Sequence, residues 1–270
     1  MEFTGAESLA RLRNEEADLA AAAKRYERVV LWFEHDSYDQ LILARCLAHF
    51  AGNGAPQVLE LVTVDRFPGS ARFIGLGQLP PEAGRLLWAY RRPVTRSQRD
   101  LGARVWQTLQ SHDPTPLHEA ARTSTPALPQ MAGAIRRHLR ELPSTVNGTA
   151  LTEHLALECL KDGPMPMGRM FRDLMLEKDP LPWLGDLMFF HILEEMLRAE
   201  QPAFEVDPAT TEDEWPRWIV TLTDTGRAVL AGEQDYLSLG PPERWVGGVR
   251  IAPGQPCWRW DEAEGRPVWR

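Results

Sequence analysis

The chain has 270 residues, which is enough for one large domain or two ordinary ones, and its composition (43% hydrophobic, 25% charged) is that of a globular protein. The net charge of −8 argues against a general binder of nucleic acid or of anionic membranes, because both need a basic surface. The sequence also lacks an apolar run of the roughly 18–20 residues that a membrane span requires, and its N-terminus has no signal-peptide pattern.

The first part of the chain predicts a strand–helix–strand unit. Residues 6–27 form a charged helical pattern, and residues 28–33 are a short β-branched and aromatic run typical of a buried strand. Apolar positions recur at helical spacing over 38–50, and a second strand is predicted over 58–64. This order indicates a βαβ unit with parallel strands.

The next segment contains a glycine turn and further helices. Gly75 and Gly77 predict a tight turn, and Pro80 and Pro81 open a short helix. Helices are also predicted over about 97–110 and over 131–141. The stretch between these two helices contains several prolines and is predicted to have no helix.

From residue 144 the pattern changes. Three helices are predicted, over 149–161, 165–177 and 187–199, and two candidate strands follow over 203–206 and 218–222. Residues 223–227, which begin with Thr223, are predicted to cap a final helix. Three helices followed by a two-stranded wing is the winged-helix order. The last residues are rich in tryptophan, and the strand at 258–260 is predicted to form a hairpin with the strand around Gly247 and Gly248.

These patterns predict three segments. Residues 1–143 would form a Rossmann-like α/β domain with a partial parallel sheet, residues 144–234 an acidic α+β winged-helix-like domain, and residues 235–270 a Trp-rich β hairpin that packs on the others. Three isolated cysteines without zinc-ligand spacing favour a reducing compartment, so we expect a cytoplasmic protein.

The candidate catalytic residues are Glu34, His35 and Asp36, directly after the first predicted strand. In open α/β sheets, ligands bind beyond the carboxyl ends of the strands. His35 would act as an acid or base near neutral pH, oriented by either neighbouring carboxylate. A second interpretation places Mg²⁺ between the carboxylates and a phosphorylated ligand. A third is purely structural: Asp36 caps the following helix, and Glu34 and His35 pair with Arg45 or with the C-terminal tail.

Further candidate ligand contacts come from three other segments. Asp39 and Gln40 follow the same strand, and the Gly75–Gly77 turn with Gln78 is expected at the same edge of the sheet. The turn lacks the full glycine spacing of a dinucleotide-binding loop, so an ordinary tight turn is the competing interpretation. In the basic stretch with Arg136 and Arg140, Arg137 is a candidate clamp for a phosphate or carboxylate. Arg244 and Trp245 are candidates for stacking on a ligand ring, against the alternative of a tail anchored by buried indoles.

The winged-helix-like segment has the wrong charge for DNA. Residues 149–232 contain 7 Lys/Arg and 16 Asp/Glu, a net charge of −9. Phosphate contacts dominate the affinity for DNA and need basic side chains. The segment is therefore expected to contact a protein partner or a second copy of the chain, and nucleic acid is an unlikely partner.

Seven stretches, in this order, resemble the bacterial domain-of-unknown-function family 1835. They are WFEHDSYDQL, FIGLGQL, RRPVTRSQ, ALPQM with IRRHLRELPSTVNG, LGDLMFFHIL, LTDTGRAVLAG, and RWVGGVRI with WRWD. The resemblance covers residues 8–262 and implies an architecture, but it supplies no reaction. Relative to the family pattern, the chain is expected to be shortened at its N-terminus, which would leave the site incomplete.

The leading hypothesis is a bacterial protein with a polar crevice after the strand at 29–33. The crevice would bind a small ligand, phosphorylated or nucleotide-like, with hydrolase or transferase chemistry as one consequence. The alternative is a non-catalytic regulator that uses its winged-helix-like segment to contact a partner. The sequence identifies no cofactor and no metal site.

Overall fold

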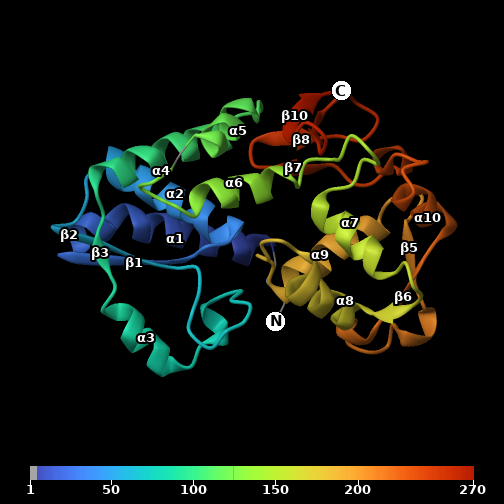
Figure 1. Ribbon diagram of the computed structural model, residues 1–270, viewed down its shortest axis with the longest axis horizontal. Coiled ribbons are helices and arrows are strands. Elements are labelled where there is room, and N and C mark those ends of the chain that lie inside the picture. The colour runs from blue at the N-terminus through green and yellow to red at the C-terminus, as the bar shows by residue number, and fades with distance from the viewer. Residues whose placement is uncertain (1–4, 124) are drawn as a thin grey trace. The chain divides into compact units, whose positions relative to one another are not determined.

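The computed structural model describes residues 5–123 and 125–270 (Figure 1), and it shows a mixed α/β chain that divides into two compact units. The first unit contains residues up to 35, with 39–107 and 125–130. The second contains 36–38, 108–123 and 131–270. The division into three segments at 143 and 234 stays a prediction. The helix at 131–139 was assigned to the first segment but belongs to the second unit.

The first unit is built on a small, partly parallel sheet with the order β1-β2-β3. Strands β1 (Arg28–Glu34) and β2 (Val58–Val64) are parallel, as the sequence predicts, and the short β3 (Arg92–Pro93) pairs antiparallel with β2. The helices of this unit are α1 (Gly5–Arg25), α2 (Ser37–Gly52), α3 (Pro81–Trp88) and most of α4 (Arg96–Leu109), with a 3₁₀ turn at Leu76–Gln78.

The sheet has apolar packing on both faces. In the view of Figure 1, α2 and α4 lie above β1 and β2, and α3 lies below them. The two helices approach closely at Gly102, where a methyl group would stand 2.5 Å from Leu47 Cβ. Val62, Val64 and Phe73 form a second cluster, to which Leu79 and Leu87 from the α3 region contribute. Burial on both sides explains why the strands read as continuous apolar runs.

The second unit contains most of the helices. These are α5 (Thr115–Arg122), α6 (Met131–Leu139), α7 (Leu151–Cys159), α8 (Met167–Asp173) with a π turn at Leu174–Lys178, α9 (Asp186–Leu197) and α10 (Asp224–Leu230). A three-stranded antiparallel sheet has the order β4-β6-β5, formed by β4 (Met165–Pro166), β5 (Phe204–Val206) and β6 (Ile219–Leu222). Short 3₁₀ turns occur at Pro208–Thr210, Trp215–Arg217 and Tyr236–Leu239.

The core of this unit lies between α7, α8, α9 and the sheet, and Phe189, Leu193 and Met196 of α9 are buried in it. Helix α10 begins where expected, because the Thr223 side chain accepts a hydrogen bond from Gly226 N at 3.0 Å. Helix α5 was not predicted, and the segment expected to be one helix over 165–177 begins with strand β4.

The C-terminal region forms antiparallel hairpins, but the predicted pairing between them is wrong. Strand β7 (Arg244–Val246) pairs with β8 (Val249–Ile251), and β9 (Trp258–Asp261) pairs with β10 (Arg266–Trp269). Each pair forms a separate two-stranded sheet. Gly247 has φ 56° in the two-residue turn between β7 and β8, a conformation that glycine adopts readily and that favours a tight hairpin.

None of the helices in the described part of the chain is long and apolar enough to span a membrane.

Candidate functional site

The candidate residues of the first unit lie at one edge of the parallel sheet. The register places Glu34 opposite Val64, so that His35 and Asp65 follow the two strands at the same end. Helix α2 begins at Ser37, shortly after β1. This is the position at which open α/β sheets bind ligands, beyond the carboxyl ends of the strands.

Glu34 is the centre of a hydrogen-bond network at this edge. Its carboxylate Oε1 accepts a hydrogen bond from Leu76 N at 2.6 Å, across 42 residues of sequence. Its backbone N–H donates to Asp39 Oδ2 at 2.6 Å, and its backbone carbonyl accepts from Gln40 Nε2 at 2.5 Å. Burial raises the pKa of the Glu34 carboxyl, opposed by the Leu76 hydrogen bond and supported by the negative charge of Asp39.

The glycine turn contacts Glu34, as the sequence suggested for this edge. A methyl group at Gly75 would stand only 2.4 Å from Glu34 Oε2, whereas Gly77 has open space around it. Gln78 Oε1 accepts from Ile74 N at 2.8 Å, so this side chain braces the turn itself. The Leu76 N–H already donates to the Glu34 carboxylate. This carboxylate therefore occupies the position in which a phosphate would bind the backbone of the turn.

Two buried polar atoms at this edge have no hydrogen-bond partner among the described residues. One is Nδ1 of His35, whose half-buried ring stacks on Phe73 with centroids 5.7 Å apart. The other is Oε1 of Gln40, whose side chain is 1% exposed and whose amide nitrogen bonds to Glu34. Buried polar atoms normally have partners. Gln40 Oε1 can only accept a hydrogen bond, and His35 Nδ1 accepts one in the tautomer that carries its proton on Nε2.

His35 is a base held neutral by its surroundings. Burial lowers the pKa of its imidazole, and the effect outweighs the opposing contributions of Asp65, a hydrogen bond with the Val64 backbone, and Asp39. Asp36 is buried, 6% exposed, and groups with the second unit. Arg45, one of the partners considered for Glu34, pairs with Glu16 of α1.

Arg137, the candidate clamp for an anionic ligand, forms hydrogen bonds and ion pairs with carboxylates of its own chain. The residue is 3% exposed and bonds Asp179 through Nε (2.9 Å to Oδ1) and Nη2 (2.7 Å to Oδ2). It also bonds Glu141 at 2.5 Å and Thr152 at 3.0 Å. Asp179 is fully buried, and its charge and that of Glu141 raise the pKa of the guanidinium. We therefore do not retain Arg137 as a ligand contact, because its donors serve these internal partners.

Arg244 and Trp245 lie on β7, in the second unit. Arg244 Nη1 donates to the Glu141 carbonyl at 3.0 Å, and its Nε lies 3.4 Å from Glu153 Oε1. Trp245 is 60% exposed. The structure thus places the predicted site residues in two groups, one in each unit.

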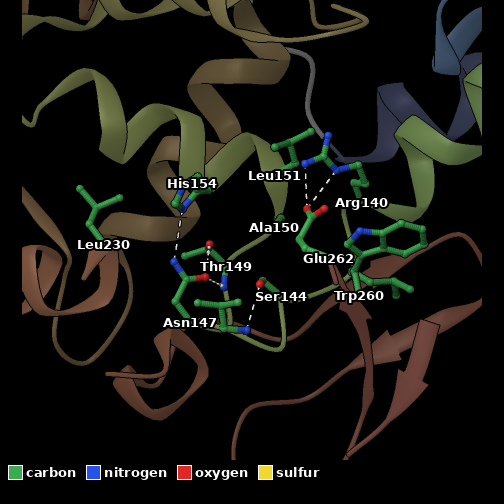
Figure 2. Close-up of a pocket in the computed structure, with 12 residues that line it drawn as sticks. Arg140, Ser144, Asn147, Thr149, Ala150, Leu151, His154, Leu230, Trp260 and Glu262 are labelled. Atoms are coloured by element: carbon green, nitrogen blue, oxygen red, sulfur yellow. Dashed lines mark hydrogen bonds and ion pairs between the residues drawn. The ribbon is translucent and has the colours of Figure 1, made fainter. Parts of the chain in front are cut away.

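Sequence reasoning missed a pocket of about 330 Å³ in the second unit, shown in Figure 2. Several of its polar groups have internal partners: Arg140 pairs with Glu262 at 2.8 Å, and Asn147 bonds His154 and Thr149. The buried Nε1 of Trp260, which also lines the pocket, has no partner among the described residues. The signal available in the sequence was the run Ser-Thr-Val-Asn-Gly-Thr, read only as a boundary between segments. With Arg140 and Asn147 already paired, this pocket offers a ligand mainly apolar contact and one indole N–H donor.

Within the described residues, no group of three or more His, Cys, Asp or Glu side chains is arranged to hold a metal ion. Comparison of the chain with protein-family models, with curated proteins and with solved structures gave no match, so the site rests on its own geometry.

Proposed function

We propose that the first unit binds a small ligand at the carboxyl edge of β1 and β2, where the ligand donates hydrogen bonds to His35 Nδ1 and Gln40 Oε1. The observation that carries this proposal is the pair of buried polar atoms at a single strand end that have no partner among the described residues. Leaving buried polar atoms unpaired costs about 1–3 kcal/mol each, and a bound donor removes that cost. We interpret the unit as Rossmann-like on the basis of its parallel β1-α2-β2 segment.

The charges around the edge define the ligand class. The negative charge of Asp39 raises the pKa of both Glu34 and His35, and the negative charge of Asp65 raises the pKa of His35. A phosphate would meet these carboxylates, and the Leu76 amide that could bind it is occupied by Glu34. A nucleotide-like ligand would therefore present its sugar hydroxyls or the N–H groups of its base to this edge. Any phosphate would extend away from the three acidic side chains.

The same residues suit acid–base chemistry. Burial raises the pKa of the Glu34 carboxyl, which favours a role as proton donor, and burial lowers the pKa of the His35 imidazole, which favours a role as proton acceptor. Glu34 and His35 are adjacent in sequence and differ in this way, which is the pattern expected of a proton donor and acceptor in a hydrolase or a transferase. Ligand binding is the primary proposal, and the reaction follows only if a bound ligand places a scissile bond beside His35.

A thermal-shift screen tests this proposal. The probes are adenosine, ribose, adenosine monophosphate and inorganic phosphate, with divalent metals screened separately. Saturating adenosine or ribose is expected to raise Tm by about 5 °C, from about 2.7 kcal/mol of stabilisation at 100 times Kd. The shift should disappear in Gln40→Leu and His35→Phe, and it should persist in His112→Phe, which alters an exposed histidine. The proposal fails if none of these probes stabilises the protein, or if the Gln40→Leu shift equals that of the wild type.

The second candidate function is a regulator that contacts a protein partner or a second copy of the chain through the second unit. The observation behind it is the element order α7, β4, α8, α9, β5, β6 with the sheet order β4-β6-β5, which we interpret as winged-helix-like. The loop between β5 and β6 carries Glu212, Asp213 and Glu214, so we expect it to avoid DNA. Light scattering across a concentration series tests self-association, and a monomer at all concentrations removes the homodimer.

Membership of family 1835 and a cytoplasmic location complete the proposal. The location is supported by the three free cysteines, Cys46, Cys159 and Cys257. An alignment of family members tests the membership. It should show the acceptor pair His35 and Gln40 retained together, and independent loss of either residue would separate the proposed site from the family.

A further inference from the structure

A second pocket, of about 290 Å³, lies within the second unit and has a different chemistry from the one in Figure 2. Helix α9 contributes His191 and Glu195 to it, strand β7 contributes Arg244 and Trp245, and Trp183 comes from the segment before α9. Two indoles, carboxylates and one guanidinium therefore share a single cavity. Its volume is at the small end of the range seen for ligand pockets.

The guanidinium of Arg244 is held in place with one donor left over. Its Nη1 bonds the Glu141 carbonyl at 3.0 Å, and its Nε faces Glu153 at 3.4 Å. Glu153 is itself fixed, because its Oε2 accepts from Ala150 N at 2.7 Å. The Nη2 atom is buried and makes no hydrogen bond within the described part of the chain. A rigid arginine with an unused donor is suited to bind an acceptor.

Trp183 supplies a second unused donor in the same pocket. Its indole Nε1 is buried and has no partner in the described residues. The Arg137 guanidinium lies 6.0 Å from the centroid of its ring, and Arg137 is anchored to the buried Asp179. The ring of Trp183 is thus backed by a rigid ion network. Trp245, 60% exposed, offers a second aromatic surface at the pocket.

The charges of the wall favour an uncharged ligand. Three glutamates (Glu141, Glu153 and Glu195) line the pocket, and each is paired with an arginine (Arg137, Arg244 and Arg198), so the wall leaves no unpaired arginine for an anion. A cation would be attracted by the carboxylates, but it cannot satisfy the unused N–H groups of Arg244 and Trp183, because these need an acceptor. An uncharged group with a carbonyl oxygen or ring nitrogen meets both conditions.

We propose that this pocket binds an uncharged, planar ring carrying hydrogen-bond acceptors, such as a nucleobase or an aromatic amide. The ring stacks on Trp245, and its acceptors receive hydrogen bonds from Arg244 Nη2 and Trp183 Nε1. The pocket is independent of the site proposed at β1 and β2, because every residue invoked here belongs to the second unit. Failure of one proposal therefore leaves the other standing.

The test uses three probes of nearly the same shape and different charge: benzamide, benzoate and benzamidinium, with uracil as a nucleobase. Binding to the whole chain is measured by calorimetry and by saturation-transfer NMR. Benzamide and uracil are expected to bind at least tenfold more tightly than benzoate or benzamidinium. Tightest binding of benzoate or of benzamidinium would overturn the proposed ligand class, and absence of binding by all four probes would overturn the site.

Matched variants locate the binding. Trp245→Ala should abolish benzamide binding, whereas Trp269→Ala, which removes a tryptophan of equal exposure (60%) outside this pocket, should leave it unchanged. Trp183→Phe keeps one six-membered ring and removes the pyrrole ring with its N–H donor, so affinity should fall at least about tenfold, the size expected of one hydrogen bond. Equal effects of Trp245→Ala and Trp269→Ala would show that benzamide binds elsewhere, and so would unchanged affinity in Trp183→Phe.

Discussion

Replacement of Arg137 by methionine tests the buried ion network of the second unit. The guanidinium donates to Asp179, Glu141 and Thr152, and the side chains of Arg137 and Asp179 are 2% and 0% exposed. Methionine fills a similar volume but leaves two carboxylates without their cation. Breaking a buried pair from one side costs about 3–5 kcal/mol. For a chain of this size we expect Tm to fall by about 6–15 °C.

The assay is urea unfolding followed by circular dichroism, with calorimetry for Tm. Arg140→Met is the matched control, because Arg140 also pairs with a glutamate (Glu262) but with side chains 31% and 46% exposed. An exposed pair contributes about 0–1 kcal/mol. Adding Asp179→Asn to Arg137→Met should recover part of the loss, since it removes a buried uncompensated charge. The reasoning is refuted if Arg137→Met costs no more than Arg140→Met.

Three further outcomes are expected. Burial lowers the pKa of His138 from 6.5 to about 4, with Glu141 opposing and Arg137 reinforcing the shift. As the pH falls, the unfolded chain therefore binds this proton before the folded chain does. The contribution of the neutral His138 to the free energy of unfolding is present above pH 6.5 and is lost as the pH falls toward 4. Between pH 6.5 and 4, the urea midpoint should fall less in His138→Phe than in the wild type. It should fall as much as in the wild type in His191→Gln, which alters an exposed ring. Gly75→Ala should cost about 1–2 kcal/mol in urea unfolding, because the methyl group displaces the Glu34 carboxylate from Leu76, whereas Gly77→Ala should cost less than 0.5 kcal/mol. Anisotropy of a labelled DNA duplex at low salt should show no saturable binding, and salt-dependent binding would contradict the charge argument.

The elements that the sequence predicts well are those whose signal is local. β1, α2 and β2 follow from apolar runs and helical spacing, and α10 follows from its threonine cap. Helix α5 was missed because its prolines were read as breakers. Pro114 stands at the N-cap of α5 and Pro116 in its first turn, where a missing N–H breaks no intrahelical bond. The hairpin pairing was wrong because tryptophan alternation indicates a strand but not its partner.

The candidate site was predictable in position but not in its internal partners. Strand order alone places Glu34 and His35 at the carboxyl edge of the parallel strands, and the glycine turn was expected there too. The bond from Leu76 N to Glu34 could not be read from the sequence, because it joins residues 42 positions apart through tertiary packing. The internal partners of Arg137 could not be read from the sequence for the same reason. Its anionic partner Asp179 is also 42 residues away and has no local signature.

The central claim, a ligand donor at the strand edge, is tested most directly on His35 itself. A long-range ¹H–¹⁵N NMR spectrum of the imidazole would be recorded with and without the probe that gives the largest thermal shift. The account predicts that the Nδ1 resonance of His35 moves on binding, because this atom gains a hydrogen-bond donor, and that the ring stays neutral at pH 7. A ligand that binds while the Nδ1 resonance stays in place would contradict the proposed site.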